Sequence, residues 1–314
     1  MRILQNLPLF YYPGTWVYVD DDKNLLKCIE IVLKQHANIK TFSSPKICLN
    51  FLNRYHASCV EKKYFNRCDQ DESFGILRYS PVDFDITSIV RLSEETERHD
   101  EVTVIVIDYH MPEMNGFLLS QSITKSPVQK ILLTGTDDDS NVITGFNHSY
   151  IHRYIQKGDQ DMEEKLTDYL YELTLQHFQT LTAPLLAHLE AENPIALSDP
   201  VFVEFFKRWC RQKNIREYYL IDKQGSFLGV DNRGEKRCFI VQTDSSINDW
   251  MTYCEVENEL SDQVVAEIKE RIRVPFFGIG KNPWDIEIEE WPSCLFSCDV
   301  LVGREKYYWF ERKM

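Results

Sequence analysis

The stretch VTVIVIDYHMPEMNG, from Val102 to Gly116, decides the fold of the first half of this chain. Its first six residues are apolar or β-branched, as in a strand that is buried on both faces of a parallel sheet. The strand ends on a carboxylate, Asp108, and Met-Pro and Asn-Gly follow at once, which predicts a sharp turn. A single aspartate at a strand end is most often a turn former, so its meaning depends on the neighbouring strands.

Apolar segments and helical patterns alternate around this strand. The alternation predicts a doubly wound parallel α/β sheet with helices on both faces. Such folds bind ligands at the carboxyl ends of their strands. The expected strands are 16–22, 38–42, 102–108, 130–135 and 150–157, and the expected helices are 23–37, 44–55, 116–125 and 161–192.

Polar functional residues stand at the ends of four of these strands. Asp20 and Asp21 follow the first strand, Asp108 ends the third, Thr134 ends the next, and Lys157 ends the last. Because parallel strands share one carboxyl edge, these side chains are expected to lie close together. Neighbouring carboxylates favour a cation, and Mg²⁺ prefers oxygen ligands. Such an edge could transfer a phosphoryl group to Asp108, with Mg²⁺ and Lys157 neutralising negative charge.

As a set, these residues resemble the receiver domain of two-component response regulators, over roughly residues 15–175. The resemblance implies that Asp108 is the phospho-acceptor. It also implies Mg²⁺ bound by Asp20, Asp21, Asp108 and the backbone carbonyl of His110. The residues that carry it are Asp20, Asp21, Asp108, Met111-Pro112, Asn115-Gly116, Thr134-Gly135 and Lys157.

The resemblance further implies that Thr134 and Lys157 sense the phosphoryl group and that Tyr154 is the aromatic switch residue. The expected partner is a sensor histidine kinase or a phosphotransfer protein. The chain departs from the family pattern at Gly158, where a proline is usual, and at Gly135, where alanine is common. Neither departure removes a phosphorylation residue, so an active receiver is expected. The arrangement as a whole also resembles quorum-sensing response regulators of Legionella.

The expected domain boundaries follow from spacing and composition. Residues 1–15 are expected to be an N-terminal extension and residues 16–175 the receiver. About 40 residues before Asp108 exceed what a compact unit needs, which predicts an insertion at about 55–100 that contains a helix. Residues 176–193 are expected to form a helical connector with a break or kink near Pro184. Residues 194–314 form the remaining domain.

The second half reads as an α+β output domain with a mainly antiparallel sheet. Short turns separate three strand-like segments between residues 217 and 243, which predicts a meander. Ser198, Asp199 and Pro200 predict a helix start. The helix that follows is both basic and aromatic, which admits a DNA-binding interpretation, although an amphipathic helix with a solvated basic face is favoured.

Composition restricts the function classes. The formal net charge is −14 and both halves are acidic, unlike a general nucleic-acid binder. No apolar run approaches the length of a membrane span, and the first residues make a poor secretory signal. The chain has nine cysteines, an odd number, and no expected secretory signal. It is therefore expected to be cytoplasmic, with reduced thiols and without a membrane partner.

Three hypotheses remain for function. The favoured one is a phosphorylation-controlled switch that forms a homodimer and whose output domain binds a protein or a small ligand. The alternative is a transcription factor that binds DNA by a non-standard surface. The third, an enzyme in the second half, lacks a cluster of polar catalytic residues in the sequence and is not expected.

Overall fold

The computed structural model describes residues 6–54, 86–124, 127–135, 144–192, 196–257, 261–281 and 285–314. The chain divides into two compact units. One contains residues 12–84 and 95–181 and is called the parallel-sheet unit. The other contains residues 1–11, 85–94 and 182–314 and is called the antiparallel-sheet unit.

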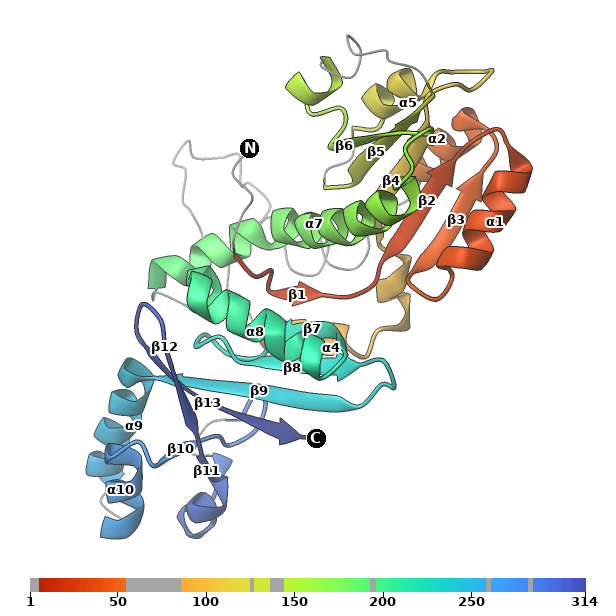
Figure 1. Cartoon of the computed structure of the whole chain (residues 1–314). Helices are drawn as coiled ribbons and strands as arrows, with labels where there is room; N and C mark the ends of the chain where they lie inside the picture. The colour runs from red at the N-terminus through yellow and green to blue at the C-terminus, as the bar shows by residue number, and fades with distance from the viewer. Residues whose placement is uncertain are drawn as a thin grey trace, which may run out of the picture. The chain divides into compact units, whose positions relative to one another are not determined.

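The parallel-sheet unit contains a five-stranded sheet in the order β3-β2-β4-β5-β6 (Figure 1). All four strand pairings are parallel, so the predicted doubly wound sheet is confirmed. The strand that ends on Asp108 is central in it. The strands are β2 (Thr15–Val19), β3 (Asn38–Phe42), β4 (Val102–Asp108), β5 (Gln129–Thr134) and β6 (Arg153–Gln156).

Helices cover both faces of this sheet. On one face Val104 and Val106 pack with Leu26 of α1 (Lys23–Leu33) and Leu170 of α7 (Met162–Glu192). The opposite face carries Ile105 and Ile107, which join apolar residues of α2 (Pro45–Arg54) and α5 (Gly116–Ser122). A short 3-10 helix, η1 (Thr96–Asp100), precedes β4. Because alternate residues of β4 serve both cores, the near-continuous apolar run in its sequence is explained.

The antiparallel-sheet unit contains a six-stranded sheet in the order β1-β7-β8-β9-β13-β12. Every pairing in it is antiparallel, and the predicted meander is β7, β8 and β9. Its strands are β1 (Phe10–Tyr11), β7 (Ile215–Leu220), β8 (Phe227–Asp231), β9 (Lys236–Thr243), β12 (Asp299–Val302) and β13 (Lys306–Lys313). The predicted α+β class is therefore confirmed.

The remaining elements of this unit are helices and one small sheet. β10 (Arg273–Pro275) and β11 (Leu295–Ser297) pair with each other. The neighbouring strands β11 and β12 therefore belong to different sheets. The helices are α4 (Ile86–Leu92), η2 (Ala196–Ser198), α8 (Pro200–Gln212), α9 (Asp244–Glu257), α10 (Asp262–Lys269) and η4 (Ile288–Cys294).

The division of the chain differs from the expected boundaries in two places. β1, at the end of the expected N-terminal extension, pairs with β7 in the antiparallel sheet. The helix expected in the insertion exists as α4, but it lies against β7 and not on the parallel sheet. Residues 55–85, most of the expected insertion, lie outside the described part of the chain. Local patterns predict that a segment is a strand or helix, but not which sheet it joins.

The expected connector is the second half of one long helix. α7 runs from Met162 to Glu192 with Pro184 inside it, so the helix is not broken at the proline, and the alternative of a kink there stays a prediction. In the part of the chain that the structure describes, no helix, α7 included, combines the length and the apolar character needed to cross a bilayer.

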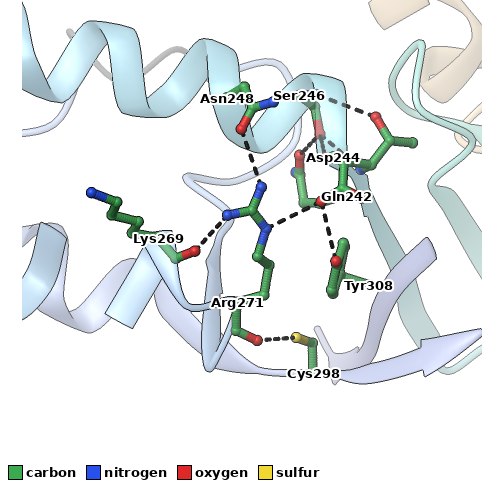
Figure 2. Close-up of polar contacts among 9 residues, drawn as sticks. Gln242, Asp244, Ser246, Asn248, Lys269, Arg271, Cys298 and Tyr308 are labelled. Atoms are coloured by element: carbon green, nitrogen blue, oxygen red, sulfur yellow. Dashed lines mark hydrogen bonds and ion pairs between the residues drawn. The ribbon is translucent and has the colours of Figure 1, made fainter. Parts of the chain in front are cut away.

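A polar network fastens α9 and α10 to the antiparallel sheet (Figure 2). Arg271, just after α10, donates to Asp244 at the start of α9 (Nε to Oδ1, 3.1 Å) and to Asn248 (Nη2 to Oδ1, 3.1 Å). Tyr308 of β13 donates to the same Asp244 oxygen at 3.1 Å. Arg271 holds this position with a positive φ of 57°, a costly conformation for a non-glycine residue.

Asp199 is the main polar anchor of α8. It caps the helix by accepting from the Val201 amide at 2.9 Å, and Pro200 follows at the first helical position, as predicted. Its other oxygen accepts from the Arg304 amide at 2.5 Å and from the Tyr307 hydroxyl at 2.8 Å. The carboxylate is buried, and these donors lower its pKa although burial alone would raise it. One side chain thus connects α8 to the β12–β13 turn.

Asp199→Ala should lower the free energy of unfolding by about 2–4 kcal/mol, because it removes a helix cap and leaves buried donors without an acceptor. Urea denaturation at pH 7 measures this. Asp262→Ala, in the first turn of α10, is the control and should change stability by less than about 0.5 kcal/mol. Since the pKa of Asp199 is lowered on folding, the difference should shrink as the pH falls below about 4. Equal stabilities at pH 7 would contradict this role.

Candidate functional site

Three carboxylates meet at the carboxyl edge of the parallel sheet. Asp20 and Asp21 follow β2, and Asp108 ends the neighbouring strand β4. One oxygen of each lies within 4.8 Å of the other two. Asp20 and Asp108 are buried, whereas Asp21 is exposed. The structure therefore brings together the three acidic side chains that the sequence analysis assigned to a metal site.

The three consecutive aspartates after β2 have different structural roles. Asp22 caps α1 by accepting from the amides of Asn24 at 2.8 Å and Leu25 at 3.2 Å. Asp20 accepts from the Asp22 amide at 2.9 Å, which fixes its carboxylate in the buried position. Because Asp22 caps α1, Asp20 and Asp21 are the aspartates of this run that cluster with Asp108.

Lys157 joins two of these carboxylates. Its Nζ lies 2.9 Å from Asp108 Oδ1 and 3.0 Å from Asp20 Oδ2. The backbone places it there: the Lys157 amide donates to the carbonyl of Thr134 at 2.7 Å, just beyond the paired ends of β5 and β6. Burial opposes the charged ammonium, but the hydrogen bonds to Asp108 and Asp20 raise the pKa of Lys157 overall. The lysine is therefore a cation at neutral pH.

Burial raises the pKa of Asp108 above its usual range, and the Asp20 charge raises it further. Lys157 and a backbone hydrogen bond from His110 act in the opposite direction. A buried carboxylate beside a second one is a site where an added cation would be stabilising. The oxygen-only donor set suits Mg²⁺. The role expected for the carbonyl of His110 stays a prediction.

The sharp turn after Asp108 has a steric cause. Gly116 lies so close to the strand end that an added Cβ would collide with the backbone carbonyl of Asp108. Its amide donates to the carbonyl of Tyr109 at 2.9 Å, which closes the turn. Asn115 then caps α5 by accepting from the Leu118 amide at 2.8 Å. By contrast, no atom of the described residues lies within 4 Å of the place where a Cβ of Gly135 would be.

Thr134 and Tyr154 lie at the same end of the sheet or near it. Thr134 ends β5 and is buried. Tyr154 of β6 pairs with Leu132 of β5, and the Tyr154 side chain is 46% exposed. The ring of Tyr154 makes an edge-on contact with that of Phe146, with centroids 6.1 Å apart. Their expected roles as sensor and switch remain predictions, since residues 136–143 lie outside the described part of the chain.

One contact of the turn after Asp108 was not predicted from the sequence. The Ser44 hydroxyl, just before α2, donates to Glu113 in the turn after Asp108 at 2.8 Å. Ser44 was interpreted only as a helix-start residue, and no local signal in the sequence connects it to Glu113. The bond connects the β3–α2 loop to the turn that follows Asp108.

The parallel sheet with an acidic carboxyl edge and a lysine across it agrees with the resemblance to response-regulator receivers that the sequence predicted. Over 100% of its length the chain is similar to the response regulator LqsR of Legionella pneumophila, with 27% identity, a TM-score of 0.78 and 91% of LqsR covered. This match confirms the resemblance predicted from the sequence. It also supports a two-component response regulator.

Two receiver structures match a smaller part of the chain. The BeF3-activated receiver domain of DrrB has 23% identity and a TM-score of 0.32, covering 51% of this chain and 97% of that domain. TrrA of Thermotoga maritima, in complex with Mg²⁺ and BeF, has 15% identity and a TM-score of 0.31, covering 51% of this chain and 98% of TrrA. No protein-family model and no curated protein matches the chain.

Lys157→Met should destabilise the metal-free protein by about 1–3 kcal/mol, because it leaves two close carboxylates without their cation. Millimolar Mg²⁺ should then raise the melting temperature of the variant more than that of the wild type, since the metal replaces the lost charge. Differential scanning fluorimetry with and without Mg²⁺ measures both effects.

The matched control is Lys165→Met. Lys165 pairs with Asp159 at 2.9 Å on an exposed surface, so its loss should cost less than about 0.5 kcal/mol and leave the Mg²⁺ response unchanged. The interpretation of the acidic edge as a Mg²⁺ site fails if Mg²⁺ stabilises neither the wild type nor the Lys157 variant.

Proposed function

We propose that this chain is the response regulator of a two-component phosphorelay and accepts a phosphoryl group on Asp108. The observation that carries the proposal is the contact of Lys157 with both Asp108 and Asp20, at 2.9 and 3.0 Å, beside the exposed Asp21. The donor would be a sensor histidine kinase or a phosphotransfer protein. The full-length similarity to LqsR supports the same class.

The chemistry is a transfer between two nucleophiles. A carboxylate oxygen of Asp108 forms a bond to phosphorus, the bond from phosphorus to the donor breaks, and the donor leaves with the electron pair. Lys157 already lies within hydrogen-bond distance of Asp108 and neutralises charge on the transferred oxygens. Bound by Asp20, Asp21 and Asp108, Mg²⁺ would supply additional neutralisation. Hydrolysis of the acyl phosphate returns the carboxylate.

The switch that follows would depend on Thr134, Lys157 and Tyr154. Phosphorylation adds negative charge at an edge that is already acidic. We propose that the Thr134 hydroxyl and the Lys157 ammonium bond the phosphoryl oxygens, and that the half-exposed ring of Tyr154 repacks against its neighbours. Because α7 follows β6, a change there would reach the helix that continues into the other unit.

For the antiparallel-sheet unit we propose binding of a protein or a small ligand, without enzyme activity of its own, in the cytoplasm. The DNA-binding alternative relied on the aromatic, basic helix α8. Phe202, Phe206 and Trp209 of that helix are buried in the unit's core, and Arg211 pairs with Glu204 at 3.0 Å. This arrangement favours an amphipathic helix with a solvated basic face over a recognition helix.

Incubation with Mg²⁺ and acetyl phosphate should add one phosphoryl group to the wild type and none to Asp108→Asn. Intact-protein mass spectrometry measures the addition. Asp159→Asn, which changes a partly exposed aspartate after β6, is the control and should be modified like the wild type. Phosphorylation of Asp108→Asn to the wild-type extent would show that Asp108 is not the acceptor.

Phosphorylation should also promote a homodimer, since the proposed rearrangement changes the surface around Tyr154 and α7. Sedimentation velocity of the phosphorylated and unphosphorylated wild type should show a larger dimer fraction in the phosphorylated sample. Tyr154→Ala should be phosphorylated normally but dimerise less. The same mass distribution with and without phosphate, at every accessible concentration, would contradict this proposal.

A further inference from the structure

The antiparallel sheet ends in an edge strand with an apolar surface. Among the described strands, β12 pairs with β13 alone, so it forms one edge of the six-stranded sheet (Figure 1). An edge strand presents backbone N–H and C=O groups that can pair with another strand. Proteins usually protect such edges with charges or proline, but β12 has the sequence Asp-Val-Leu-Val, with a single charge at its start.

Two valines of β12 face solvent on the same side of the sheet. Val300 is 53% exposed and Val302 is 66% exposed, and residues two apart in a strand share a face. Val300 lies opposite Tyr308 of β13, which is buried and held by Asp244 in the network of Figure 2. The helices thus protect this face at β13, whereas the valines of β12 remain open.

We infer that β12 pairs with β12 of a second copy of this chain, in antiparallel orientation about a two-fold axis at Leu301. In this register Val300 of each copy faces Val302 of the other. Leu301 faces its own counterpart, and Asp299 faces Gly303. The two sheets would then join into one continuous sheet across the axis.

A second copy of this chain is the expected partner because β12 is self-complementary, as a two-fold contact requires. Every directly opposed pair at residues 300–302 is apolar, and the charged Asp299 lies opposite Gly303, which has no side chain. Moving the axis to Val302 would leave Val302 and its counterpart as the single opposed pair within the strand, since residues 303–305 turn back to β13. Moving it to Val300 would place Asp299 opposite Leu301. The register about Leu301 is therefore the favoured one of the three.

The contact would be weak by itself. A pairing of four residues buries much less than the roughly 1,000 Å² of a stable interface. It would therefore be populated at high protein concentration, or when another contact already holds two copies together. The inference does not rest on phosphorylation of Asp108, because the strand edge is present in the structure as it stands.

Cysteine trapping in the Asp108→Asn protein tests the register without a contribution from a phosphorylated receiver. Leu301→Cys should form a disulfide between copies under mild oxidation, since opposed residues lie about 5 Å apart between Cα atoms. Val302→Cys alone should cross-link several-fold less, because its counterpart lies about 7–8 Å away. A mixture of Val300→Cys and Val302→Cys proteins should cross-link efficiently. Peptide mapping separates these bonds from those of the nine native cysteines.

Sedimentation velocity of the same Asp108→Asn protein gives an independent readout. Changing both Val300 and Val302 to Lys should reduce self-association at least several-fold at high concentration, with unchanged circular dichroism. The control changes Ile31 and Val32 to Lys, an exposed apolar pair on α1, and should leave it unchanged. The inference is overturned if the two double variants associate alike. It is also overturned if Leu301→Cys cross-links no more than Val302→Cys or an Ile31→Cys control.

Discussion

The site depends on one ammonium group held between two buried carboxylates. Lys157 contacts Asp108 at 2.9 Å and Asp20 at 3.0 Å, so the ends of β2, β4 and β6 must lie at one level for the contacts to form. Without a cation, burial of two carboxylates so close together would be strongly unfavourable. The parallel registers of the sheet and the Gly116 turn, which keeps the chain close behind Asp108, provide this alignment. The proposed binding of Mg²⁺ and of a phosphoryl group depends on the same alignment, because both would change the balance of charge around Lys157.

The chain segments next to Asp20, Asp108 and Lys157 lead into the antiparallel-sheet unit. β1, which pairs with β7, precedes β2 and Asp20 in the chain. α4, which lies against β7, precedes β4 and Asp108, and α7 follows Lys157 and continues past the boundary at residue 181. A change of charge at the site therefore has covalent routes into the other unit along three elements. A single flexible linker between receiver and output would provide only one.

Much of this arrangement was predictable, because it follows from local patterns in the sequence. The apolar run of β4, the strand-helix alternation and the polar strand ends predicted the parallel sheet and the cluster of Asp20, Asp21 and Asp108. The assignment of β1 and α4 to the antiparallel sheet was not predictable, since a two-residue strand and a seven-residue helix carry no signal for their distant partner. The contact of Ser44 with Glu113 is of the same kind. The apolar spacing of α7 predicted the helix, and the helix is not broken at Pro184, because an otherwise intact helix can retain a proline.

The central claim is that the acidic edge binds Mg²⁺ and a phosphoryl group together at Asp108. Fluorine-19 NMR of the wild type with beryllofluoride, a non-transferable analogue of the phosphoryl group, tests it most directly. The account predicts bound-state resonances that appear only when Mg²⁺ is present and that are absent in Asp108→Asn. Bound resonances that persist in Asp108→Asn, or that never appear in the wild type with Mg²⁺, would contradict it.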